Sequence, residues 1–162
     1  MTNRFMVHPL KLAVSLATAL FSAAMALCLA GLGRWGASLL FLAVAALFLS
    51  VSLVFGAFIT VDAGGVRRSV LGKVSRELPW DRIAEVGVAG SKIFNRNNPK
   101  KTGSLYIYFS PVPMTEEQRF DMMLNWPPRE QLFFLYTEQR INAVQLLWSG
   151  EIQTYNSGDL HF

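Results

Sequence analysis

Residues 12–32 read LAVSLATALFSAAMALCLAGL, and residues 37–59 read ASLLFLAVAALFLSVSLVFGAFI. Neither run contains a charged side chain, and only the four residues GRWG (33–36) separate them. A helix needs about 20 apolar residues to cross the ~30 Å hydrocarbon core of a bilayer, where the backbone must satisfy its own hydrogen bonds. The two runs therefore predict two transmembrane helices that form an antiparallel hairpin, which occupies residues 1–59.

The remaining residues, 60–162, have the composition of a small soluble domain. All 11 acidic residues of the chain lie there, while the 15 Lys and Arg are spread over both parts and leave a formal net charge of +4. This part is close to neutral, which argues against a nucleic-acid-binding protein. About 100 residues are enough for one domain with its own core.

The positions of the basic residues predict the orientation of the hairpin. Arg4 and Lys11 precede the first run, whereas Arg34 is the only charge in the short connection. Four basic residues follow the second run: Arg67, Arg68, Lys73 and Arg76. The positive-inside rule then places both termini and the polar domain in the cytosol, in a two-helix protein of the cell membrane. A cleaved signal peptide is the alternative for the first run, but this run is longer than the 7–15 apolar residues typical of such signals.

Small side chains recur every four residues in the first run, at Thr18, Ser22, Ala26 and Ala30. Residues four apart share one face of a helix, and small side chains let helices approach closely in lipid. The ridge predicts helix packing, either within the hairpin or, as the alternative, against a second copy or a partner.

Short apolar stretches separated by glycine-rich turns fill the polar part and predict an antiparallel meander. The expected strands are residues 60–62, 66–71, 74–78, 83–89, 104–110 and 131–136. A closing helix is expected over residues 138–149, with a core face formed by Ile141, Val144, Leu147 and Trp148. The fold class is therefore α+β.

Three phrases carry a resemblance to a known family: ITVD (59–62), GVRRSVLGK (65–73) and LPWDRIAEV (78–86). With the hairpin directly before them, they resemble the membrane-anchored bacterial pleckstrin-homology-like (bPH) domain proteins over residues 36–110. The resemblance implies a two-sheet, partly open antiparallel barrel or sandwich, plugged at one end by the C-terminal helix. It implies an architecture and no particular activity.

Residues 111–130 exceed the length of a simple connection between two strands. The sequence TEEQ (115–118) has the form of a capping box and predicts a short helix that ends before Trp126 and two prolines. Phe120, Met123 and Leu124 would share its apolar face. Two interpretations stay open: the helix covers an edge of the barrel, or it forms, with Trp126, a docking surface for a partner.

Basic side chains cluster in a stretch without acidic residues, at Lys92, Arg96, Lys100 and Lys101. Such a loop could bind anionic lipid headgroups, each basic residue contributing about 1 kcal/mol near the surface, or it could be fully solvated. Arg67 and Arg68 form a second candidate contact of the same kind.

Signals for catalysis are weak in this sequence. His8 and His161 lie near the two ends, without the spacing of a metal site or a nucleophilic triad, and no phosphate-binding glycine loop is present. We therefore expect no enzyme, no cofactor and no metal. The expected function is a protein-interaction or scaffold module at the membrane, with an unidentified protein partner. An anionic-lipid sensor and an accessory subunit of a transporter or enzyme complex are the alternatives.

Overall fold

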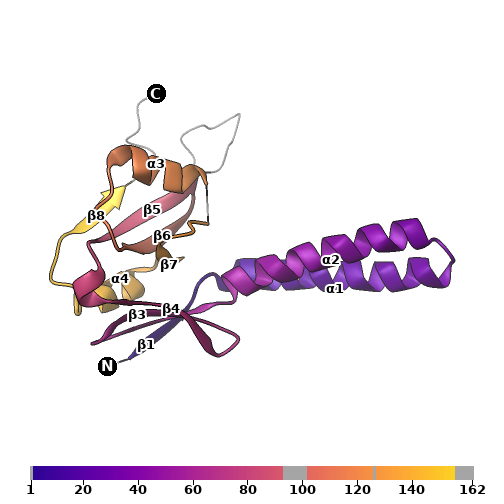
Figure 1. Cartoon of the computed structure of the whole chain (residues 1–162), viewed down its shortest axis with the longest axis horizontal. Helices are drawn as coiled ribbons and strands as arrows, with labels where there is room; N and C mark the ends of the chain where they lie inside the picture. The colour runs from indigo at the N-terminus through magenta and orange to yellow at the C-terminus, as the bar shows by residue number, and fades with distance from the viewer. Residues whose placement is uncertain (1, 93–101, 126, 156–162) are drawn as a thin grey trace. The chain divides into compact units, whose positions relative to one another are not determined.

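The computed structural model describes residues 2–92, 102–125 and 127–155, with the side chains of residues 91, 92, 102, 103 and 155 left out. The described chain divides into two compact units. One unit is a helical hairpin, Met6–Ala57, together with the turn Val70–Gly72. The other unit contains two sheets and the remaining helices (Figure 1).

The hairpin consists of α1 (Pro9–Gly31, 23 residues) and α2 (Trp35–Phe55, 21 residues). His8 caps α1 by accepting a hydrogen bond from the backbone N–H of Lys11, and Pro9 occupies the first turn, where its missing N–H costs nothing. Gly56 ends α2, so the predicted second helix is too long at its end: Phe58 and Ile59 already belong to a strand. By length and composition, both helices are long and apolar enough to span a bilayer.

Small residues line the contact between α1 and α2. The buried positions are Ser15, Ala19, Ser22 and Ala26 on α1, and Ser38 and Ser52 on α2. Ser38 Oγ donates to the carbonyl of Ala26 at 2.8 Å, and Ser52 Oγ donates to Ser15 Oγ at 2.8 Å. Of the predicted ridge, Ser22 and Ala26 are buried within the hairpin, while Thr18 and Ala30 are half-buried.

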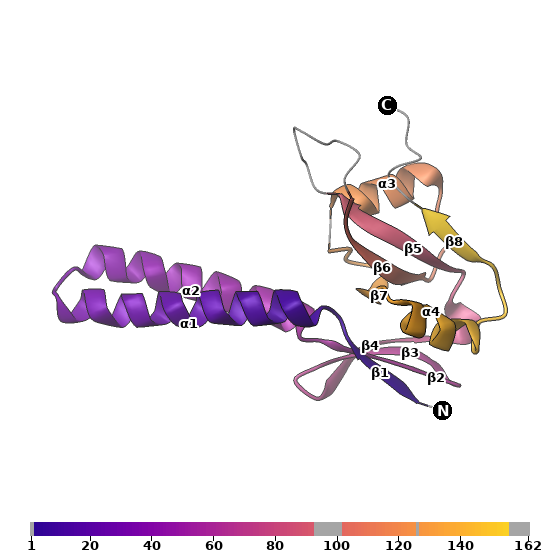
Figure 2. The ribbon, with the colours of Figure 1, turned by 180° about the vertical axis from the view of Figure 1, so that it is seen from behind.

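The first sheet has the strand order β1-β2-β3-β4 (Figure 2). Its strands are β1 (Asn3–Met6), β2 (Phe58–Asp62), β3 (Gly65–Val70) and β4 (Lys73–Pro79). β2 pairs with β3 in antiparallel register, from Phe58 opposite Ser69 to Asp62 opposite Gly65. The sequence did not predict β1, which precedes the first apolar run and is hydrogen-bonded to β2. The residues before Met6 thus belong to the same unit as the strands, although they were expected within the hairpin segment 1–59.

The second sheet has the strand order β7-β6-β5-β8. Its strands are β5 (Glu85–Lys92), β6 (Thr102–Ser110), β7 (Leu132–Leu135) and β8 (Ile152–Tyr155). β6 is antiparallel to both neighbours, so the predicted strands 83–89, 104–110 and 131–136 form an antiparallel meander. β8, which the sequence did not predict, is parallel to β5 and makes this sheet mixed. The predicted closing helix is also too long. α4 (Glu138–Gln145) ends early, and the chain continues into β8.

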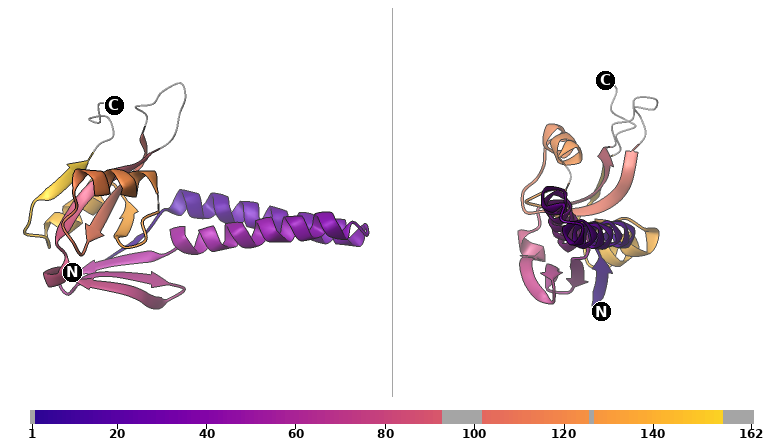
Figure 3. Two further views of the ribbon diagram at one scale, coloured as in Figure 1. Left: turned by 45° about the horizontal axis from the view of Figure 1, so that its top comes forward. Right: turned by 90° about the vertical axis from the view of Figure 1, so that its right-hand side faces the viewer.

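Aromatic side chains pack in the core of the two-sheet unit, whose strands and helices Figure 3 shows in two further views. Phe134 stacks on Phe5 of β1 at 5.1 Å between ring centroids and on Phe109 of β6 at 5.9 Å. Trp80, in the short 3-10 helix η1 (Trp80–Arg82), contacts Phe109 and donates to the carbonyl of Asp62 at 2.8 Å. Of the four residues expected in the core of the closing helix, Ile141 and Val144 are buried, whereas Leu147 and Trp148 are half-buried. The α+β class is confirmed.

We predict that Ala26→Leu destabilises the hairpin. Ala26 is 1% exposed, and its carbonyl accepts the Ser38 hydrogen bond, so a larger side chain must push the two helices apart. Overpacking of this kind costs about 1–3 kcal/mol. Thermal unfolding of the full chain in detergent should show a lower midpoint.

The matched control for this substitution is Ala24→Leu, because Ala24 is exposed on another face of α1. This variant should unfold like the unmodified chain. Equal midpoints for the two leucine variants would contradict the packing observed between α1 and α2.

Candidate functional site

Helix α3 (Glu116–Leu124) begins with the predicted capping box. The hydroxyl of Thr115 accepts from the N–H of Gln118 at 3.3 Å, and the N–H of Thr115 donates to Gln118 Oε1 at 2.9 Å. Of the expected docking residues, Met123 is buried, Phe120 is half-buried and Leu124 is 49% exposed, while Trp126 lies outside the described residues. Met122, which the sequence did not single out, is buried beside Met123.

α3 packs mainly against β5, an inner strand of the second sheet. Residues 106–110 of β6, the strand next to β5, are all buried, so both faces of the sheet are covered at this strand. A strand with both faces covered carries apolar side chains on both sides. The main contact of the helix is therefore with the sheet at an inner strand, and its interpretation as a docking surface stays a prediction.

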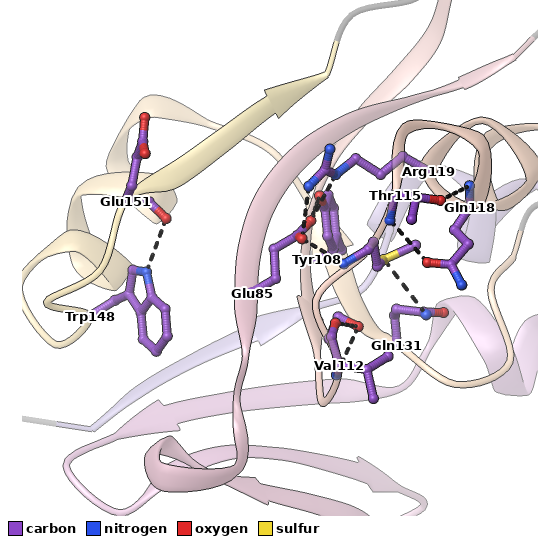
Figure 4. A network of polar contacts seen from close by, with 11 residues as sticks. Glu85, Tyr108, Val112, Thr115, Gln118, Arg119, Gln131, Trp148 and Glu151 are labelled. Carbon is purple, nitrogen blue, oxygen red and sulfur yellow. Dashed lines mark hydrogen bonds and ion pairs between the residues drawn. The ribbon is translucent and has the colours of Figure 1, made fainter.

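A buried carboxylate joins α3 to this sheet, as Figure 4 shows. Glu85 Oε1 accepts from the hydroxyl of Tyr108 at 2.5 Å and from Arg119 Nε at 2.9 Å. Glu85 Oε2 accepts from Arg119 Nη2 at 2.8 Å and from the backbone N–H of Met114 at 2.9 Å. The three side chains come from β5, β6 and α3, which lie apart in the sequence.

The environment of this network keeps Glu85 ionised. The side chains of Glu85 and Arg119 are only 7% and 16% exposed. Burial by itself raises the pKa of the Glu85 carboxyl, but the hydrogen bonds from Arg119, Tyr108 and Met114 outweigh it and lower the pKa below its ordinary value. Burial and the neighbouring carboxylate raise the pKa of the Tyr108 hydroxyl, which stays protonated and acts as a donor.

Gly87 provides the space that the Tyr108 ring occupies. The two residues are direct partners in the β5–β6 ladder, so their side-chain positions share one face of the sheet. A Cβ atom at residue 87 would lie 2.5 Å from the Cζ and hydroxyl atoms of Tyr108, closer than any real contact. The glycine therefore allows the tyrosine to lie across β5 and reach Glu85, two residues away along the strand.

Chemically, this arrangement works as a structural attachment. A carboxylate offers about four acceptor positions, and four donors from protein groups occupy those of Glu85. No acceptor position remains for a substrate or an ion. Among the described residues, no group of three or more His, Cys, Asp or Glu side chains could hold a metal.

The structure separates the two arginines of the second candidate contact. Arg67 forms an ion pair with Asp62, while Arg68 is the ladder partner of the buried Ile59. Neighbouring residues of a strand point to opposite faces, so the pair does not form one patch. Burial first, and repulsion by Arg76 second, lower the pKa of Arg68, and its Nε atom is buried without a hydrogen-bond partner in the described part of the chain.

The basic loop lies almost wholly outside the described residues. Arg96, Lys100 and Lys101 are among those not described, and only the backbone of Lys92 is placed, as the last residue of β5. The proposed contact of this loop with lipid stays a prediction.

Sequence reasoning missed the Glu85 network. One signal was present: Glu85 is the only charged residue between Ile83 and Ser91, a stretch that otherwise has the pattern of a buried strand. A charged residue in such a strand requires a partner, but the sequence does not say that Arg119 provides it.

Comparisons of the chain with family models, with curated proteins and with solved structures found no match. The function is therefore argued from the geometry of this chain.

We predict a pH dependence of stability that originates from Glu85. Its pKa in the folded state lies below the ordinary value of 4.5, so the carboxylate stabilises the fold above that pH. This contribution is lost as the pH falls through the folded-state pKa. Glu85→Gln should lower stability at neutral pH by about 2 kcal/mol, the range for hydrogen bonds to a charged group, and should weaken the pH dependence below 4.5.

The measurement is the unfolding midpoint of the full chain in detergent as a function of pH. Glu77→Gln, at an exposed carboxylate of β4, is the control and should follow the unmodified chain. If Glu85→Gln showed the same acid dependence as the unmodified chain, the network would not hold an ionised carboxylate.

Proposed function

We propose that this chain is an integral membrane protein whose helical hairpin anchors a cytosolic two-sheet domain that binds a protein partner, without catalytic activity. One observation carries the proposal most directly. Two helices of membrane-spanning length lie, in the sequence, between two strands that are neighbours in one sheet.

The exposure of the hairpin supports membrane insertion. Most residues of α1 and α2 are exposed to the surroundings, including many large apolar side chains. Among them are Leu20, Phe21, Leu27, Leu39, Leu40 and Leu47. A core helix of a soluble protein would bury such residues, whereas lipid-facing helices expose them to hydrocarbon. The contact between the helices uses small residues and hydroxyl hydrogen bonds, which is typical of helix pairs in membranes.

The pairing of β1 with β2 supports a common side for both ends of the hairpin. Two strands of one folded sheet lie in one compartment, so a hairpin between them enters and leaves the bilayer on the same face. Arg4, Lys11 and the four basic residues of β3 and β4 favour the cytosolic side over the external one.

Protein binding is the role that the domain supports better than catalysis. Its buried ionisable network is fully used in attaching α3. Leu124, the last residue of α3, is 49% exposed, and Val112, in the connection that precedes the helix, is 50% exposed. A surface of this kind fits an apolar patch on a partner. Anionic-lipid sensing and a role as an accessory subunit are the alternatives.

The motif resemblance leads us to propose that the domain belongs with the bPH family. Two four-stranded sheets and a helix that follows β7 support this assignment. The parallel strand β8 after α4 departs from a domain that is closed by its C-terminal helix.

We predict the topology of the hairpin from this proposal. In a Cys28→Ala background, a cysteine at Gly36 should react with a membrane-impermeant thiol reagent added to intact cells, because residue 36 follows the turn between the helices. A cysteine at Ala63, in the exposed turn between β2 and β3, should react only after the cells are opened. Reaction of the Ala63 cysteine in intact cells would contradict the cytosolic placement.

We predict that α3 contacts a protein partner. A photo-reactive amino acid at Leu124 in the full chain should form a discrete protein adduct in native membranes. The same amino acid at Glu138, an exposed residue of α4, is the control and should not. Adducts with lipid alone at Leu124 would favour the lipid alternative, and adducts at neither position would exclude α3 as the docking surface.

A further inference from the structure

The turn between β3 and β4 has an unusual residue at its centre. Leu71 has φ +50° and Gly72 has φ +81°, so both central residues adopt the left-handed conformation of a tight hairpin turn. Asparagine and glycine favour this conformation, whereas a bulky residue adopts it only with strain. Leu71 is the only residue other than glycine with positive φ in the described part of the chain.

Contacts within the protein do not compensate for this strain. The Leu71 side chain is 85% exposed, and that of Val74, just beyond the turn, is 58% exposed. Lys73, between them, is also exposed. The turn thus presents two apolar side chains and one cation to the surroundings. Backbone strain that side-chain packing does not offset points to a function at that position.

The strand register places this turn at the level where α2 ends. Phe58, the first residue of β2, is the partner of Ser69, and α2 ends only three residues earlier, at Phe55. Residues 70–72 therefore extend past the start of β2, toward the helix end. In agreement with this, Val70–Gly72 belongs to the same compact unit as the two helices.

We infer that the β3–β4 turn lies in the headgroup region of the bilayer, with Leu71 and Val74 in contact with the acyl-chain boundary. The Lys73 ammonium group lies toward the lipid phosphates. A membrane-spanning α2 has its end at Phe55 in this region, and Lys11, which lies over the Phe55 ring at 5.2 Å, places another cation at the same level. Exposed apolar side chains beside a cation are the pattern of segments that bind at a membrane interface. This inference rests on the proposed insertion of the hairpin.

The test measures lipid contact in the full chain, in nanodiscs that contain lipids with a spin label high on the acyl chain. A fluorophore is attached to Leu71→Cys in a Cys28→Ala background, and we expect the lipid spin label to quench it. The matched control is Ala63→Cys, in the turn at the opposite end of β3, which should escape quenching. The unmodified chain, labelled at Cys28 on the exposed side of α1, reports insertion of the hairpin itself.

A second variant separates the role of leucine from the effect of the fluorophore. Leu71→Asn suits the left-handed backbone and removes the apolar side chain, so the thermal midpoint should not fall. A fluorophore at Val74→Cys, which the lipid spin label should quench while residue 71 is leucine, should nevertheless lose this quenching in the Leu71→Asn background.

The outcomes distinguish this inference from the proposed function. Quenching at Cys28 combined with equal, low quenching at residues 71 and 63 would overturn the interfacial turn and leave the membrane hairpin in place. A lack of quenching at Cys28 would overturn both. If the cysteine at residue 71 instead formed disulfides between two copies and was shielded from lipid, the turn would be a self-association surface and the inference would be wrong.

Discussion

β1 and β2 are hydrogen-bonded neighbours in one sheet, although the complete helical hairpin separates them in the sequence. Just inside the hairpin, the N–H of Val7 donates to the carbonyl of Ala57 at 2.9 Å. The N–H of His8 donates to the carbonyl of Phe55 at 3.1 Å. These bonds fix the two ends of the hairpin beside each other. β3 and β4 then extend the sheet from β2, so the first half of the domain depends on this pairing.

The second sheet depends on a different interaction, the buried carboxylate of Glu85. Placing a charge in a protein interior is unfavourable unless hydrogen bonds replace its hydration, and here four donors do so. Removing one partner, such as Arg119, would leave the buried Glu85 carboxylate without full compensation. This cost favours the single arrangement in which all four hydrogen bonds form. The network attaches α3 to β5, while Glu117 and Asp121 of the same helix are exposed.

Local features of this fold could be predicted from the sequence, and non-local ones could not. The apolar runs and the capping box at Thr115 are patterns of neighbouring residues. The helices that they predicted, α1, α2 and α3, are confirmed. β1 has only four residues, and its partner lies beyond the hairpin; β8 is equally short and pairs with the distant β5. In the same way, Arg119 meets Glu85 only through the fold, and Arg67 and Arg68 separate because a strand alternates its faces.

The central claim is that the β1–β2 connection closes the base of the hairpin, and hydrogen exchange at the Val7 amide tests it most directly. For the full chain in nanodiscs, we expect this amide to exchange as slowly as the amides of β2, since its N–H is bound to the Ala57 carbonyl. Exchange of the Val7 amide at the rate of an unfolded segment, while β2 stays protected, would show that the base of the hairpin is not closed at residue 7 and would contradict the account.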